Sequence, residues 1–128
     1  MTATNDPRPR SGEQAAAVTN AVVALLRDYL GRGPTRAKTI LNDDAAMVLL
    51  SDTLTRGEQR LVAEGEQQAV LDLRRRFQSA MRDDLVSAVE TIVGRRVAAF
   101  MSDNSMEPDV MAEIFVFEPP GDGKEPGR

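Results

Sequence analysis

EQQAVLDLRRRFQSAMRDDLVSAVETIV, residues 66–93, is the stretch on which the fold depends. Its apolar residues recur at steps of three and four over about seven turns, which is the spacing of one face of an α-helix. Gly94 follows directly, and a glycine in the left-handed conformation commonly ends a helix. The sequence therefore predicts one long amphipathic helix. Its apolar stripe consists of Val70, Leu73, Phe77, Ala80, Met81, Leu85, Val89 and Ile92.

Two shorter helices are predicted before the long one. The first covers residues 12–30, and Ser11 stands three residues before Gln14, the spacing of a capping box. The second begins after Thr55, which has Glu58 as its reciprocal capping partner.

Four β-like runs separate these helices into groups. Turn-forming residues lie between the two runs of each pair, which predicts two hairpins. The order of elements is α-β-β-α-α-β-β, and it predicts an α+β fold with one four-stranded antiparallel sheet and the long helix packed on one face. The runs are residues 36–41, 45–50, 95–101 and 110–117.

The last run, VMAEIFVF, is apolar on both of its faces, with Glu113 as its one polar residue. An antiparallel strand with one face in water should alternate more cleanly between apolar and polar residues. Both faces of the sheet are therefore expected to be covered. A partner chain would cover one of them in a homodimer. The alternative is a monomer whose helices wrap both sides.

Composition excludes several classes of enzyme. The chain has 128 residues, a formal charge of −4, no Cys and no His. Catalytic triads that need a histidine cannot form within the chain, and zinc sites almost always use Cys or His. We expect no enzymatic activity, no metal and no cofactor. The acidic balance gives no electrostatic footprint for nucleic acid, so no nucleic-acid partner is expected.

The ends of the chain differ from its body. Residues 1–10 and 119–128 are polar and rich in Pro or Gly, and we expect both to be disordered tails around a single domain at residues 11–118. No stretch has the apolar length of a signal core or a membrane helix. The sequence thus predicts a cytoplasmic protein without direct membrane insertion.

Basic residues beside glycines form the candidate binding site. Glycines expose backbone N–H groups to anions, and nearby cations supply charge. The simpler interpretations are a helix stop at Gly31 or Gly33, which Pro34 enforces, and a solvated helix face for the arginines. The candidate anion- or partner-binding residues are Gly31, Arg32, Gly33, Arg36, Lys38, Arg74 and Arg76.

Several segments, in order, resemble a known family. The chain is similar in these segments to the bacterial MpsC-like family, named for the C component of a sodium-translocating, membrane-potential-generating system. The resemblance covers residues 14–118. The segments are YLGRGP (29–34), LTRGE (54–58), the long arginine-bearing helix, GRRV (94–97), FMSD (100–103) and EIFVFE (113–118).

The resemblance implies a role within a membrane transport system, and it identifies no catalytic residue in this chain. Members look like small soluble accessory proteins associated with membrane cation or inorganic-carbon transport systems. The expected function is therefore a non-enzymatic accessory protein that docks on membrane transporter subunits, peripheral to the inner face of the membrane. The alternative is a homodimeric regulatory domain that binds a small molecule or an anion.

Overall fold

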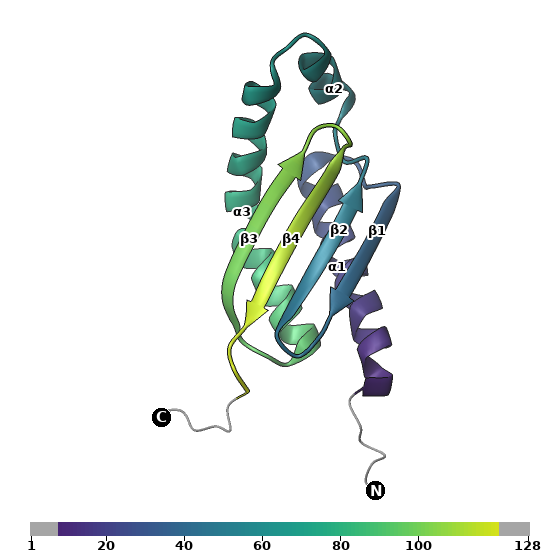
Figure 1. Ribbon diagram of the computed structural model, residues 1–128, viewed down its shortest axis with the longest axis vertical. Coiled ribbons are helices and arrows are strands. Elements are labelled where there is room, and N and C mark those ends of the chain that lie inside the picture. The colour runs from purple at the N-terminus through teal and green to yellow at the C-terminus, as the bar shows by residue number, and fades with distance from the viewer. Residues whose placement is uncertain (1–7, 121–128) are drawn as a thin grey trace, which may run out of the picture.

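The computed structural model describes residues 8–120 as three helices and four strands (Figure 1). The two predicted tails lie largely outside this range. Residues 8–10 of the first one belong to a helix. In chain order the elements are α1 (Arg8–Leu30), β1 (Arg36–Leu41), β2 (Ala45–Ser51), α2 (Arg56–Ala63), α3 (Gln67–Val93), β3 (Val97–Ser105) and β4 (Val110–Phe117).

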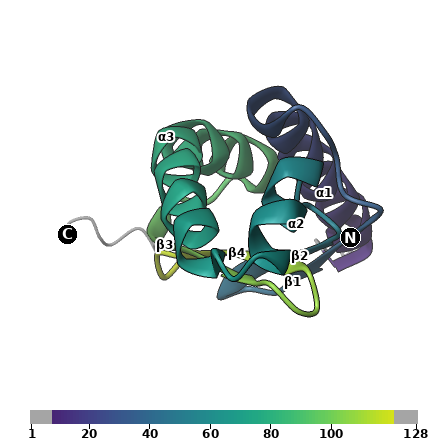
Figure 2. The same ribbon diagram turned by 90° about the horizontal axis from the view of Figure 1, so that it is seen from above.

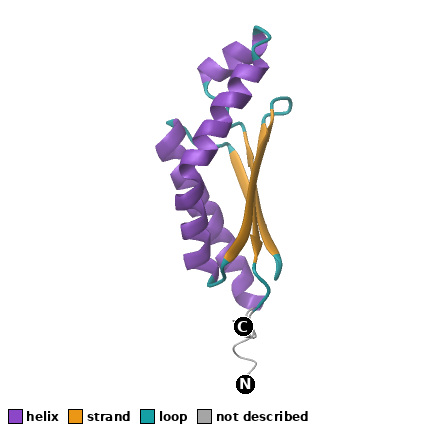
Figure 3. Cartoon of the chain, turned by 90° about the vertical axis from the view of Figure 1, so that its left-hand side faces the viewer, coloured by secondary structure: helices purple, strands orange, loops and turns teal. Residues whose placement is uncertain are grey.

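The strands form one antiparallel sheet in the order β1-β2-β4-β3. Figure 2 shows the helices on one side of this sheet, and Figure 3 shows the other side without a described element over it. The predicted α+β order and the sheet with a long helix on one face are confirmed. The alternative in which the helices wrap both sides is wrong.

The core lies between the sheet and the pair α1–α3. Alternate residues of the two central strands point toward the helices, and they are fully buried along β2. Gly31 and Gly94 end α1 and α3 in the left-handed conformation, with φ of 83° and 76°. The core cluster comprises Val18, Val22, Leu26, Ala46, Val48, Leu50, Met81, Leu85, Val89, Met111, Phe115 and Phe117.

Three predicted details are wrong. Helix α1 begins at Arg8, so Ser11 lies inside the helix and is not its N-cap. Strand β3 continues to Ser105 because it stays paired with β4 up to the tight turn. Leu73 is 42% exposed, because the buried face of α3 runs through Val70, Arg74 and Gln78 instead.

A buried ion pair fixes α2 against α3. Arg74 is fully buried, and its Nε donates to Glu58 Oε2 at 2.9 Å while its Nη2 reaches Glu58 Oε1. Glu58 also completes the predicted capping box with Thr55. Burial alone would raise the pKa of Glu58, but hydrogen bonds from Arg74 and the Thr55 amide hold that pKa below its ordinary value.

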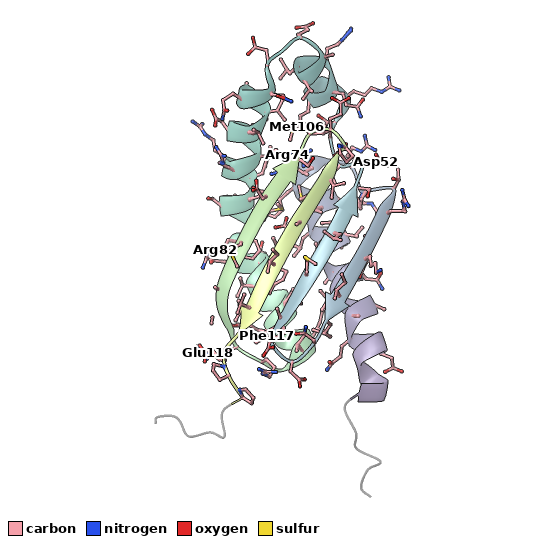
Figure 4. The ribbon with its side chains drawn as sticks, viewed as in Figure 1. Asp52, Arg74, Arg82, Met106, Phe117 and Glu118 are labelled. Atoms are coloured by element: carbon pink, nitrogen blue, oxygen red, sulfur yellow. The ribbon has the colours of Figure 1, made fainter. Side chains whose placement is uncertain are left out.

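The same arginine binds the loop that leads into α2. Arg74 Nη2 donates to the Thr53 carbonyl at 2.7 Å, and Arg32 Nη1 donates to the Leu54 carbonyl at 2.9 Å. Asp109, the last residue of the β3–β4 turn, accepts hydrogen bonds from the Thr53 and Leu54 amides. Arg74 therefore lies at the end of the sheet where the β3–β4 turn carries Met106 (Figure 4).

Replacing Arg74 with methionine should lower the free energy of unfolding by about 3–5 kcal/mol, because Glu58 is then buried without its partner. Urea unfolding measures the loss. The matched control is Arg76→Met, an exposed arginine of the same run, for which we expect less than about 0.5 kcal/mol. The double variant Arg74→Met/Glu58→Gln should recover much of the loss, since no charge stays buried. Equal losses for Arg74→Met and Arg76→Met would contradict this role of the ion pair.

Candidate functional site

The glycine-rich segment after α1 is occupied by contacts within the chain. Gly31 ends the helix, and its amide donates to the Arg27 carbonyl at 2.9 Å. Gly33 packs against the Arg27 side chain, because a Cβ at this position would lie 2.9 Å from Arg27 Nε. Arg32 turns its guanidinium toward the Leu54 carbonyl. The segment thus has a structural role at the end of the helix.

The structure distributes the other candidate cations over three places. Arg36 and Lys38 are exposed on the edge strand β1. Arg74 is sealed in the ion pair, and Arg76 is exposed on α3. Only Arg32 and Arg74 come together, since they bind the carbonyls of two consecutive residues. The seven predicted residues do not form one common pocket.

The side of the sheet opposite the helices is here called the open face (Figure 3). The residues of its two central strands are mostly apolar. Cross-strand registers place Ile40, Met47, Ile114 and Met101 in one row across all four strands. Ile40 is 43% exposed and Met101 is 50% exposed, so apolar side chains reach both edges of this row. The prediction that the last strand carries apolar residues on both faces is confirmed. Within residues 8–120, no helix or strand covers this face.

A second row on the open face has opposite charges at its two ends. It runs Lys38, Leu49, Ala112 and Asp103, from β1 through the two central strands to β3. Lys38 and Asp103 are both exposed, and neither forms an ion pair with another described residue. The open face therefore has a basic edge at β1, an apolar centre and an acidic edge at β3.

The covered side of the sheet holds polar groups that sequence reasoning missed. A pocket of about 330 Å³ opens between α3 and β3, and Gln78 and Ser102 lie in its lining. Arg82 also lines it and lies 5.7 Å from the centre of the Phe100 ring. Gln78 Nε2 and Ser102 Oγ are buried and have no hydrogen-bond partner among the described residues. Arg74 and Gln78 follow the apolar Val70 at steps of four residues, and this spacing could have indicated that they share its buried helix face.

Glu113 is a buried carboxylic acid beneath this layer. It lies directly across from Ser102 in the β3–β4 pair, and it is fully buried. Burial raises the pKa of Glu113 to about 7, and the positive charge of Arg74 offsets part of the rise. Neither carboxylate oxygen has a hydrogen-bond partner among the described residues. Near neutral pH this group is therefore divided between its neutral and charged forms.

Two further properties concern metals and membranes. Within residues 8–120, no three carboxylates converge in a group that could hold a metal ion. The helices in this part of the chain all fall short of the combined length and apolarity needed to cross a bilayer.

Glu113 should make the folded protein less stable as the pH rises from about 4.5 to 7. The folded state holds the proton more tightly than the unfolded chain, so folding stability is highest while the group is protonated in both states. Between pH 4 and 8 the loss should be on the order of 3 kcal/mol, measured by urea unfolding at each pH. Glu113→Gln should remove this slope, whereas Glu107→Gln, in the exposed β3–β4 turn, should leave it unchanged. A slope that survives Glu113→Gln would assign the pH dependence to another group.

Comparison with known proteins gives one match. The family described as Na+-translocating membrane potential-generating system (MpsC) matches residues 10–119. Neither curated proteins nor solved structures gave a match to the chain. The family match spans all seven helices and strands apart from the first two residues of α1. The chain therefore belongs to the MpsC family.

Proposed function

We propose that this protein is a non-enzymatic accessory protein that docks on membrane subunits of a sodium-translocating, membrane-potential-generating system. The family match over residues 10–119 is the observation that carries the proposal. The family's description places it in a membrane system. On this proposal the protein is cytoplasmic, lies at the inner face of the membrane through its partner, and is a homodimer.

The chemistry of the described residues supports a role in binding other proteins. Among residues 8–120, the two carboxylic acids with a perturbed pKa are both engaged in the interior: Glu58 pairs with Arg74, and Glu113 is buried on the side of the sheet that the helices cover. The chain instead exposes an apolar sheet face bordered by charges. Exposed apolar patches on folded domains commonly mark surfaces that bind other proteins.

A second candidate is an anion-binding regulatory domain, which the pocket between α3 and β3 favours. Arg75 and Arg82 lie in its lining together with the buried, unpartnered Gln78 and Ser102 groups. Guanidinium, amide and hydroxyl groups are donors that suit a small oxyanion.

Recovery from membranes tests the first candidate. A tagged copy expressed in its native cells should bring down polytopic transporter subunits in stoichiometric amounts from solubilised membranes, as identified by mass spectrometry. The control is the same tag on Arg74→Met, whose folding is weakened, so that recovery should fall with the folded fraction. Recovery of this chain alone would contradict the accessory role.

Ligand-induced stabilisation tests the second candidate. If the pocket binds an oxyanion, phosphate, bicarbonate or a nucleotide should raise the melting temperature in a concentration-dependent way. Arg82→Gln should reduce that rise, whereas Arg56→Gln, on the exposed start of α2, should keep it. No rise with any of these anions would remove this candidate.

A further inference from the structure

The charges on the open face are complementary to those of a second copy of the same face. Along the row from Lys38 to Asp103, charge runs from positive at β1 through the apolar residues Leu49 and Ala112 to negative at β3. Arg36 adds a second exposed cation on the β1 edge. The neighbouring row, which ends in Ile40 and Met101, is apolar throughout.

We propose that a second copy of this chain covers the open face, with a two-fold axis that runs parallel to the strands. Such an axis places β1 of one copy over β3 of the other, at the same height along the strands. Lys38 of each copy then faces Asp103 of its partner, and this contact occurs twice. The rows of Met47 and Ile114 meet at the centre of the interface.

The charges at the sheet edges favour a two-fold axis along the strands over a two-fold axis across them. A two-fold axis across the strands would lay β1 over β1 and β3 over β3. The basic edge of one copy, with Arg36 and Lys38, would then face the basic edge of the other, and Asp103 would face the acidic edge. Like charges in opposition are unfavourable, so the axis along the strands is the one that the edges fit.

The dimensions are adequate for a small but specific interface. Stacked sheets lie about 10 Å apart, and the flexible stem of a lysine together with an aspartate can bridge that gap. At about 3.3 Å per residue and about 4.8 Å between strands, the open face measures roughly 20 Å by 15–19 Å. Its side chains stand above this plane, so the area approaches about 500 Å² per partner, the lower limit for a specific interface and less than the roughly 800 Å² of a standard one. Aligned packing of two sheets is also the usual arrangement for such faces.

This inference rests on the homodimer in the proposed function, and it specifies which face the two copies share and how they are oriented. It is independent of docking on a membrane subunit, since it concerns the purified chain alone. A failure of membrane recovery therefore leaves the inference standing, and a monomeric chain leaves the docking proposal standing.

Charge exchange at the two edges tests the geometry. The full chain should sediment as a dimer in analytical ultracentrifugation. Lys38→Asp and Asp103→Lys should each weaken dimerisation about tenfold or more, because two attractive contacts become repulsive in each dimer. The double variant Lys38→Asp/Asp103→Lys should dimerise as the natural chain does. An equimolar mixture of the two single variants should form a mixed dimer, since each restores the charges that the other needs.

Further variants separate the open face from general effects of charge. Met101→Asp, at a half-exposed position of the apolar row, should give a monomer with unchanged circular dichroism. Arg56→Asp and Asp83→Lys make the same charge changes on exposed residues of the helices and should leave the dimer intact.

Four outcomes would overturn the inference. One is a chain that stays monomeric at about 100 μM, and another is a dimer that survives Met101→Asp. A third is single variants that weaken the dimer without recovery in the double variant or the mixture. The fourth is a membrane subunit that binds the open face of a monomeric chain, because it would assign this face to that partner.

Discussion

The buried Arg74–Glu58 pair is the constraint on which the arrangement of the elements depends. A charge removed from water has to be paired and hydrogen-bonded, so the position of Arg74 in the middle of a helix face dictates what lies against it. Glu58 of α2 supplies the carboxylate and Thr53 supplies the carbonyl. The loop that carries Thr53 is in turn held by Asp109 of the β3–β4 turn. One guanidinium thus links α3, α2 and the end of the sheet.

The same contacts lie on the covered side of the sheet, whose two sides are unequal. The helices are tied to one end and one side of it by polar contacts, and along α1 and α3 by the apolar core. No described element passes over the open face (Figure 3). The edge strands carry Arg36, Lys38 and Asp103 there, and charges on edge strands oppose uncontrolled strand pairing.

Much of the fold follows from local sequence patterns. The period of the apolar residues separated helices from strands, and the capping box of Thr55 and Glu58 was readable from spacing alone. The start of α1 and the length of β3 were not, because pairing with β4 extends β3 through Ser102 and Asp103, residues that resemble a loop. Leu73 was misassigned for a similar reason, since helical spacing allowed a second stripe and tertiary packing chose the one through Arg74.

The site was less predictable, because it depends on strand order. The arginine run by itself predicts solvated surface cations, yet three consecutive arginines span most of a helix circumference, so that one of them, Arg74, faces the core. Glu113 was noticed only as a polar residue in an apolar strand, and its raised pKa depends on what α3 places above it. Lys38 and Asp103 are far apart in the sequence. They share a row only because β2 and β4 lie between their strands.

The distribution of polar residues between the two sides of β4 argues that the open face binds another protein surface. Its covered side contains Glu113, while its open side carries Val110, Ala112, Ile114 and Val116. Partly exposed apolar residues on the outer side of a sheet contribute little to the core of their own chain, and such residues promote aggregation unless something covers them. Folding of a single chain would be served as well by polar residues at these positions. The proposed two-fold contact would account both for the apolar open face and, through its orientation, for the charges at the two edges.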